Sequence, residues 1–331
     1  MKILTLAEVQ SAGVSEHDLM LPPFDPTLPD KHQADGHLVC IAENRIQARC
    51  SLWWKNTAQL PGERTGMIGH YSAANALAAE ALLRHASETL VRQGCTLAIG
   101  PMDGNTWRRY RFVTEAGTAP PFFMEPTNPP EYPVQWTTAG FAPLASYFSA
   151  VTEDLATRDV RLDEAAERLH RNGVRFRSLK LDDFEAELER IYTVSVEAFS
   201  HNFLYTPLPR EAFIAQYRAI RPLVHPELCS IAEHEGKPVG FMFAIPDAAK
   251  GDNPDTLILK TQAVLPGRIY AGIGTLLVGK THEAGARLGY KRIIHALMHE
   301  SNNALNISSR YAQVFRRYTL FSKKLPSEVI S

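Results

Sequence analysis

Residues 264–274 read VLPGRIYAGIG and decide how the second half of the chain folds. Before them, residues 256–265 (TLILKTQAVL) form an apolar run typical of a strand. After them, apolar residues recur at helical spacing from position 273 to 288, and Gly289 ends the repeat. Glycines at a strand-to-helix junction let backbone N–H groups converge, because no Cβ blocks a close approach. The helix N-terminus adds about half a unit of positive charge, so the junction predicts an anion site suited to a pyrophosphate.

Two other phosphate-binding patterns do not fit this junction. The sequence lacks the G-x-x-x-x-G-K-[ST] pattern of a P-loop. A dinucleotide-binding G-x-G-x-x-G pattern would need a third glycine at position 277, where Leu277 is too large for close helix packing. A two-glycine pyrophosphate loop remains, although glycines also occur in strand-to-helix turns that bind nothing.

The rest of the chain shows a mixed α/β order that occurs twice. In the first half, apolar patterns predict strands at 37–42, 46–54, 65–71, 95–100 and 147–151, a long helix from about 74 to 90, and a short helix after Tyr132. In the second half they predict helices at 184–200, 211–220, 273–288 and 304–311, and strands at 228–233, 238–246, 256–265, 291–298 and 315–321. A charged stretch from 152 to 171 separates the two runs. We therefore expect an α/β fold with mixed sheets in two similar parts.

Composition narrows the function. The 331 residues exceed what one hydrophobic core usually serves, and 45% hydrophobic residues supply two. The balance of 35 Lys and Arg against 36 Asp and Glu disfavours nucleic-acid and membrane-surface partners. The four cysteines form no C-x-x-C pair, so we expect neither a metal nor a disulfide framework. No apolar run is long enough to span a bilayer, and we expect a cytoplasmic location.

The glycine junction resembles the acyl-coenzyme A (CoA) loop of the GNAT (GCN5-related N-acetyltransferase) superfamily, which reads Q/R-x-x-G-x-G/A before a helix. Gly272 and Gly274 stand at its glycines, and Ile269 stands where Arg or Gln is usual. Residues 301–313 are similar to the family's N-x-x-A-x-x-L-Y-x-x-x-G-F segment, with Ser308 at the position of the usual Tyr. Residues 128–141 of the first half resemble the same segment and keep its terminal Gly-Phe pair.

The resemblance implies two tandem GNAT folds. Residues 1–152 would form a first domain that lacks a CoA loop, residues 153–174 a connector, and residues 175–331 a second domain that has the loop. The corresponding junction of the first half, residues 68–74 (IGHYSAA), contains a single glycine with bulky neighbours. We therefore expect acyl-CoA to bind the second half alone.

The resemblance also implies the site residues. Acyl-CoA, a co-substrate, would contact Ala263, Val264, Ala271, Gly272, Ile273, Gly274, Thr275 and Asn302. The candidate acids and bases are His295, His299, Ser308 and Tyr311. His295 also fits a core histidine, and His299 also fits a solvated loop. The acceptor would contact His201, Asn202 and Tyr205, which follow an early helix of the second half.

Three functions follow as hypotheses. The first is an acyl-CoA-dependent N-acyltransferase that transfers an acetyl group to an amine of a small molecule or peptide. The second is an inactive acyl-CoA-binding sensor or scaffold, because Ser308 replaces the usual Tyr. The third is a transferase that uses aminoacyl-tRNA, since some such ligases contain paired GNAT-like folds. The neutral overall charge disfavours the third.

Overall fold

A computed structural model describes residues 1–5, 8, 21–155, 161–301 and 312–326. The predicted helix at 304–311 and the candidates Asn302, Ser308 and Tyr311 lie outside these residues. Among the described helices, none is long and apolar enough to cross a bilayer.

The first half contains seven strands and three helices among its described residues. They are β1 (Lys2–Thr5), α2 (Leu28–Lys31), β2 (Gly36–Ala42), β3 (Arg45–Trp53), β4 (Thr65–Ala73), α3 (Ala76–Arg92), β5 (Leu97–Gly100), β6 (Phe112–Glu115), α4 (Glu131–Thr138) and β7 (Ala142–Thr152). The apolar stripe of α3 packs on the sheet and buries residues such as Leu82 and Leu90, while Trp136 of α4 is fully buried beside it.

The second half follows the connector. Its main elements are α5 (Arg161–Arg171), β8 (Val174–Ser178), α6 (Phe184–Ala198), α7 (Arg210–Ala219), β9 (Cys229–His234), β10 (Lys237–Pro246), β11 (Thr256–Val264), α8 (Ile273–Arg287), β12 (Arg292–His299) and β13 (Gln313–Lys324). Residues of α6 and α7 pack in one hydrophobic cluster, and residues of α8 and α5 pack in another. Helices thus cover both faces of this part of the sheet.

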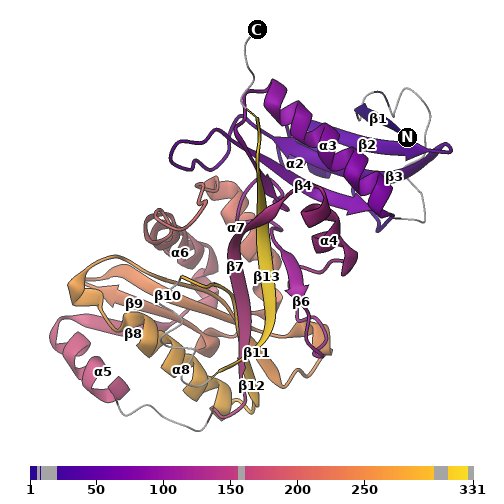
Figure 1. The fold of residues 1–331 in the computed structure, drawn as a ribbon. Helices are drawn as coiled ribbons and strands as arrows, with labels where there is room; N and C mark the ends of the chain where they lie inside the picture. Colours follow the sequence, from indigo (N-terminus) through magenta and orange to yellow (C-terminus); the bar gives the residue numbers. More distant parts are fainter. Residues whose placement is uncertain (6–7, 9–20, 156–160, 302–311, 327–331) are drawn as a thin grey trace.

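One mixed sheet runs through both halves, in the order β1-β2-β3-β4-β5-β13-β7-β12-β11-β10-β9-β8, with β6 attached to β13. The two central strands exchange partners between the halves. β7 ends the first half but pairs with β12, and β13 ends the second half but pairs with β5. The two strands also pair with each other in the antiparallel sense (Figure 1). The predicted boundary at 153–174 therefore separates the halves along the sequence, whereas the sheet continues across it.

The exchange predicts that neither half folds alone. A fragment of residues 1–152 lacks β13 and leaves β5 with an open edge, and a fragment of residues 153–331 lacks β7 and leaves β12 open. We expect each fragment expressed separately to lack a cooperative thermal transition in circular dichroism. Co-expressed fragments should purify together and recover one. A single fragment that melts cooperatively at the temperature of the intact chain would contradict this prediction.

Candidate functional site

The N-terminus of α8 has no side-chain hydrogen bond as a cap among the described residues. Its N-cap is Gly272, which adopts φ 93° and carries no side-chain cap. Leu276 N–H donates to Gly272 C=O at 3.0 Å, so the N–H groups of the preceding turn have no acceptor within the helix. Gln262 of β11 donates to Gly274 C=O at 2.6 Å and ties the first turn to the strand. These free amides, at the positive end of the helix dipole, form the geometry that an anion requires.

A cation from the connector lies beside this turn. Arg168 of α5 donates a hydrogen bond to Ala271 C=O, and its guanidinium lies 3.1 Å from where a Cβ on Gly272 would be. Leu162 of the same helix packs against Gly279 of α8. The connector helix therefore adds a positive charge to the glycine junction, a contribution that the sequence pattern did not indicate.

The N-terminus of α3 in the first half is already capped. Asn75 is its N-cap, and the Asn75 Oδ1 accepts a hydrogen bond from Ala78 N–H at 2.9 Å. The expected junction at 68–74 is strand up to Ala73, because β4 continues through it. The single glycine of that stretch, Gly69, packs so closely on Met102 that a Cβ would lie 2.2 Å from its carbonyl oxygen. Gly69 serves close backbone packing there.

Strands β11 and β12 pair only over their first four residues. The parallel register ends at Leu259 opposite His295. Beyond this point β11 contains a bulge, because Thr261 pairs with Phe243 and Leu259 pairs with Ala244, which leaves Lys260 without a partner in the ladder. The register of β12 against β7 also shifts after His295. The two strands therefore separate toward their carboxyl ends.

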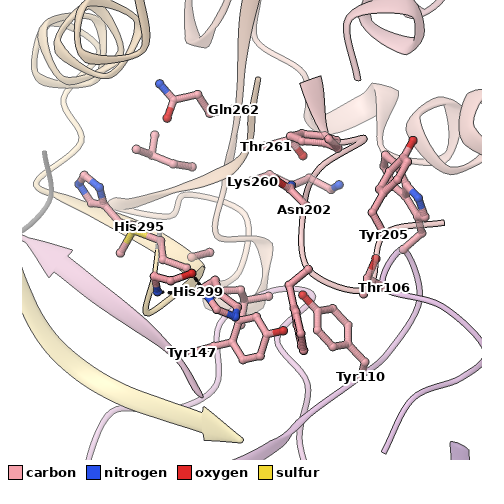
Figure 2. Close-up of a pocket in the computed structure, with 18 of the residues that line it drawn as sticks. Thr106, Tyr110, Tyr147, Asn202, Tyr205, Lys260, Thr261, Gln262, His295 and His299 are labelled. Carbon is pink, nitrogen blue, oxygen red and sulfur yellow. Dashed lines mark hydrogen bonds between the residues drawn. The ribbon is translucent and has the colours of Figure 1, made fainter. Parts of the chain in front are cut away.

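A cavity of about 520 Å³ opens where the strands separate. We call it the second-half cavity. Both halves contribute to its wall, and Figure 2 shows Lys260 of the second half and Tyr110 of the first half among its lining residues. Its lining residues include Trp107, Tyr110, Tyr147, His201, Asn202, Tyr205, Lys260, Gln262, His295 and His299. All three predicted acceptor residues and both described histidine candidates thus lie around one cavity.

His299 is held in one tautomer by its own loop. Its Nδ1 accepts a hydrogen bond from Ser301 N–H at 3.1 Å, so the neutral ring carries its proton on Nε2. That Nε2 is buried and has no hydrogen-bond partner among the described residues. The ring packs edge-on against Tyr147, with centroids 4.8 Å apart. Burial, followed by the Arg111 charge, lowers the pKa of His299, so the ring is a neutral hydrogen-bond donor near pH 7.

His295 is a buried histidine of β12 that contacts residues of β7 and α8. It is 4% exposed, and its Nε2 lies 3.3 Å from the Thr152 hydroxyl of β7. The ring of His282 lies 5.4 Å away. Burial and, to a lesser degree, His282 lower the pKa of His295 to about 3. A group with this pKa accepts protons poorly at neutral pH, which disfavours His295 as the general base.

Lys260 was not among the predicted site residues. Its ammonium lies 4.6 Å from the ring centre of Tyr217, on the face of the sheet covered by α7. Burial lowers the pKa of Lys260 to about 8, and no described carboxylate pairs with it. A lysine inside an apolar strand run is typical of an ordinary strand residue, so no local pattern marked Lys260 as a site residue. The bulge is what brings this residue to the cavity wall.

The acceptor candidates form the side of the cavity that faces the first half. Tyr205 has a buried hydroxyl without a hydrogen-bond partner among the described residues. Its ring lies 6.0 Å from that of Trp107, whose indole N–H donates to Thr206 C=O at 2.9 Å. His201 and Asn202 are exposed at the cavity rim. The contact with Trp107 holds this segment against the first half.

The remaining predicted cofactor residues belong to the junction and to the strand before it. Ile273 is buried in α8, and Gly274 and Thr275 follow it in the first turn. Ala263 is 4% exposed and pairs with Phe241 in the sheet, so its side chain serves the core. Val264 is the last residue of β11.

Comparisons with other proteins identify the fold. No protein-family model and no curated protein matches the sequence. Among solved structures, a GCN5-related N-acetyltransferase from Anabaena variabilis ATCC 29413 is similar with a TM-score of 0.54 and 11% identity, over 98% of this chain and 73% of that one. A GCN5-related N-acetyltransferase from Sphaerobacter thermophilus is similar with a TM-score of 0.50 and 12% identity, over 87% of this chain and 80% of that one.

A third similar structure is the glucosamine N-acetyltransferase region of a fungal multi-domain β-N-acetylglucosaminidase. It has a TM-score of 0.53 and 11% identity, over 91% of this chain and 38% of that one. The shared feature is the architecture, since the identities are low. The resemblance predicted from the glycine junction is confirmed at the level of the fold: this chain has the fold of the GCN5-related N-acetyltransferases, the GNAT superfamily.

Proposed function

We propose that the chain is an acyl-CoA-dependent N-acyltransferase that transfers an acetyl group to an amine of a small molecule or peptide. One observation carries the proposal: the uncapped N-terminus of α8 follows directly on β11, whose separation from β12 opens the second-half cavity. An anion-binding turn and an adjoining cavity together suit a long substrate with a diphosphate and a reactive end. The fold shared with N-acetyltransferases supports the same reading.

The glycine junction would hold the donor. The free amides around Gly272 would bind the diphosphate, and Arg168 would add a charge-assisted contact. The acyl arm would then extend along β11 into the cavity, where Gln262 and Lys260 line the wall. The first half would supply the opposite wall and the acceptor's surroundings.

The chemistry requires a proton acceptor. An alkyl ammonium has a pKa of about 10.4, so freeing the amine at pH 7 costs roughly 4 to 5 kcal/mol. The amine nitrogen then forms a bond to the thioester carbonyl carbon, and the carbon–sulfur bond breaks. The leaving thiolate has a pKa of about 8.5 and needs little help from an acid. The base is therefore the group on which the rate depends most.

Lys260 is the best-placed base. A general base works best when its pKa lies near the working pH, and burial brings the pKa of Lys260 to about 8. The ammonium group of Lys260 first loses a proton to solvent. The resulting neutral amine of Lys260 then accepts the proton of the substrate amine. His299 supplies a neutral N–H on the same cavity wall, which we assign to orienting the substrate. His295 keeps a packing role because its pKa is too low.

Replacement of Gly272 by valine tests the donor site. The valine Cβ would meet the Arg168 guanidinium and cover the free amides, so we expect Gly272→Val to abolish acetyl-CoA binding in isothermal titration calorimetry. Gly289→Val is the matched control, because Gly289 has nearly the same φ of 90° and no atom within 4 Å of its Cβ position. Both variants carry similar backbone strain. Equal acetyl-CoA affinity in the two variants would place the donor elsewhere.

Replacement of Lys260 tests the base. In the wild type, kcat should rise with pH and level off above about pH 8, because the neutral amine is the active form. We expect Lys260→Met to lose this rise of kcat with pH. We also expect it to lower kcat by about 10²- to 10⁴-fold in a thiol-release assay with a panel of amines. Lys280→Met is the control, since Lys280 also lies over an aromatic ring, that of Phe176, but is exposed on α8. Acetyl-CoA binding without turnover of any amine would favour a sensor instead.

A further inference from the structure

The first half has a cavity of its own, of about 410 Å³, that the proposed acyl transfer does not use. We call it the first-half cavity. It lies between the lead-in segment around Phe24, the end of β4 and the loops on either side of β6. Three arginines line it: Arg49, Arg109 and Arg111.

Arg111 is a buried cation without a counter-ion. It is 5% exposed, forms no ion pair with a described carboxylate, and its Nε has no hydrogen-bond partner among the described residues. Its guanidinium carbon lies 4.0 Å from the ring centre of Tyr110 and 4.2 Å from that of Tyr147. Among the described residues, its guanidinium donates one hydrogen bond, to Leu297 C=O, which is long at 3.5 Å. Cation–π contacts hold the guanidinium but do not neutralise it. A buried charge of this kind favours an anionic ligand.

Arg49 and Arg109 add to the positive charge of the same cavity. Arg49 is 9% exposed, donates to Pro22 C=O, and has its guanidinium carbon 4.7 Å from the ring centre of Phe24. Arg109 is exposed. The two lining carboxylates are engaged locally: Asp25 pairs with Lys31 at 3.3 Å, and Asp103 accepts a hydrogen bond from His70 N–H at 2.6 Å. Among the described lining residues, three arginines thus stand with two carboxylates.

A metal ion is the competing ligand, because His32, His70 and Asp103 bring potential ligand atoms within 4.8 Å of one another. The ring nitrogens of His32 and His70 lie 2.8 Å apart, at hydrogen-bond distance. The other nitrogen of His70 bonds to Ser51 at 2.8 Å. Burial, then the neighbouring histidines and the charges of Arg108 and Arg49, lower the pKa of His70 to about 3. Burial is the main cause of this low pKa, and the guanidinium charges of Arg108 and Arg49 add to it. Those two charges disfavour a metal cation here and favour an anion.

The remaining wall of the cavity is aromatic. Phe24, Tyr71, Phe112 and Tyr132 line it, and the ring of Phe24 lies beside Arg49. We infer that the first-half cavity binds a small organic oxyanion, a carboxylate or phosphate ester with an aromatic body. Guanidinium groups pair with both kinds of head group in bidentate geometry. This inference uses neither α8 nor Lys260, but Arg111 also contacts Tyr110, Tyr147 and Leu297, which line the second-half cavity.

Titration calorimetry of the full chain tests the site with four probes: phenylacetate, benzoate, phenyl phosphate and inorganic phosphate. We expect the aromatic probes to bind more tightly than inorganic phosphate. Whether phenylacetate or phenyl phosphate binds with the higher affinity will identify the preferred head group as carboxylate or phosphate. Arg109→Gln should weaken the aromatic probes about tenfold, because it removes an exposed charged contact without disturbing the core. Arg111→Gln should weaken them further. Arg64→Gln is the control, since Arg64 is exposed and outside the cavity.

Two further measurements separate the outcomes. Gly272→Val should leave probe binding unchanged, so loss of acetyl-CoA binding and loss of oxyanion binding can be told apart. Titration of Zn²⁺ into the wild type and into His32→Ala tests whether the cluster that contains His32 binds a metal cation instead. The inference is overturned if no probe binds, if Arg109→Gln and Arg111→Gln bind the probes as the wild type does, or if Zn²⁺ binds in a manner that depends on His32.

Discussion

The exchange of β7 and β13 between the halves is the constraint on which the site depends. Antiparallel pairing fixes the register, so Tyr147 of β7 lies opposite His299 of β12. This register places a first-half tyrosine against the ring of the second-half histidine and on the cavity wall. The Thr152 hydroxyl reaches His295 through the same pairing. The second-half cavity is therefore built from both halves, and it cannot form from residues 175–331 by themselves.

In each half a strand leads into a helix, and the strand after the helix pairs with the first in the parallel sense. The halves differ at the N-terminus of that helix. In the first half Asn75 caps α3, and β4 packs closely on the segment after β5 through Gly69 and the Met102 carbonyl. In the second half the N-cap is Gly272, which offers no side chain, and β11 separates from β12 after Leu259. A capped helix has fewer free amides for an anion. The proposed assignment of donor binding to the second half thus rests on a few residues.

The sequence predicted the elements whose signal is local. The strand before Gly272 and the helix after it follow from apolar periodicity, and the structure places them at Thr256–Val264 and Ile273–Arg287. The glycine junction followed from the absence of a Cβ, and the structure places Gly272 there as the N-cap of α8 with φ 93°. Strand partners leave no such local trace, because β7 and β13 have the same alternation whichever strand they pair with. Their exchange between the halves was therefore not predicted.

The site was predicted in part for the same reason. The predicted candidates His201, Asn202, Tyr205, His295 and His299 all line one cavity. The sequence could not rank them as bases, because burial and the hydrogen bond from Ser301 set their protonation. Neither Lys260 nor Arg111 was among the predicted site residues, because each becomes distinctive only through its surroundings: a bulge for Lys260, and two tyrosine rings for Arg111.

Lys260 and Arg111 differ in how a cation responds to apolar surroundings. A lysine ammonium can release its proton when it is buried, and the pKa of about 8 places Lys260 near that point at physiological pH. A guanidinium stays charged in any protein environment, so Arg111 cannot relieve its burial by deprotonation. It must find its compensation in aromatic faces or in an anion. Lysine at the separated strands thus suits proton transfer, whereas arginine in the first-half cavity suits static recognition of a negative charge.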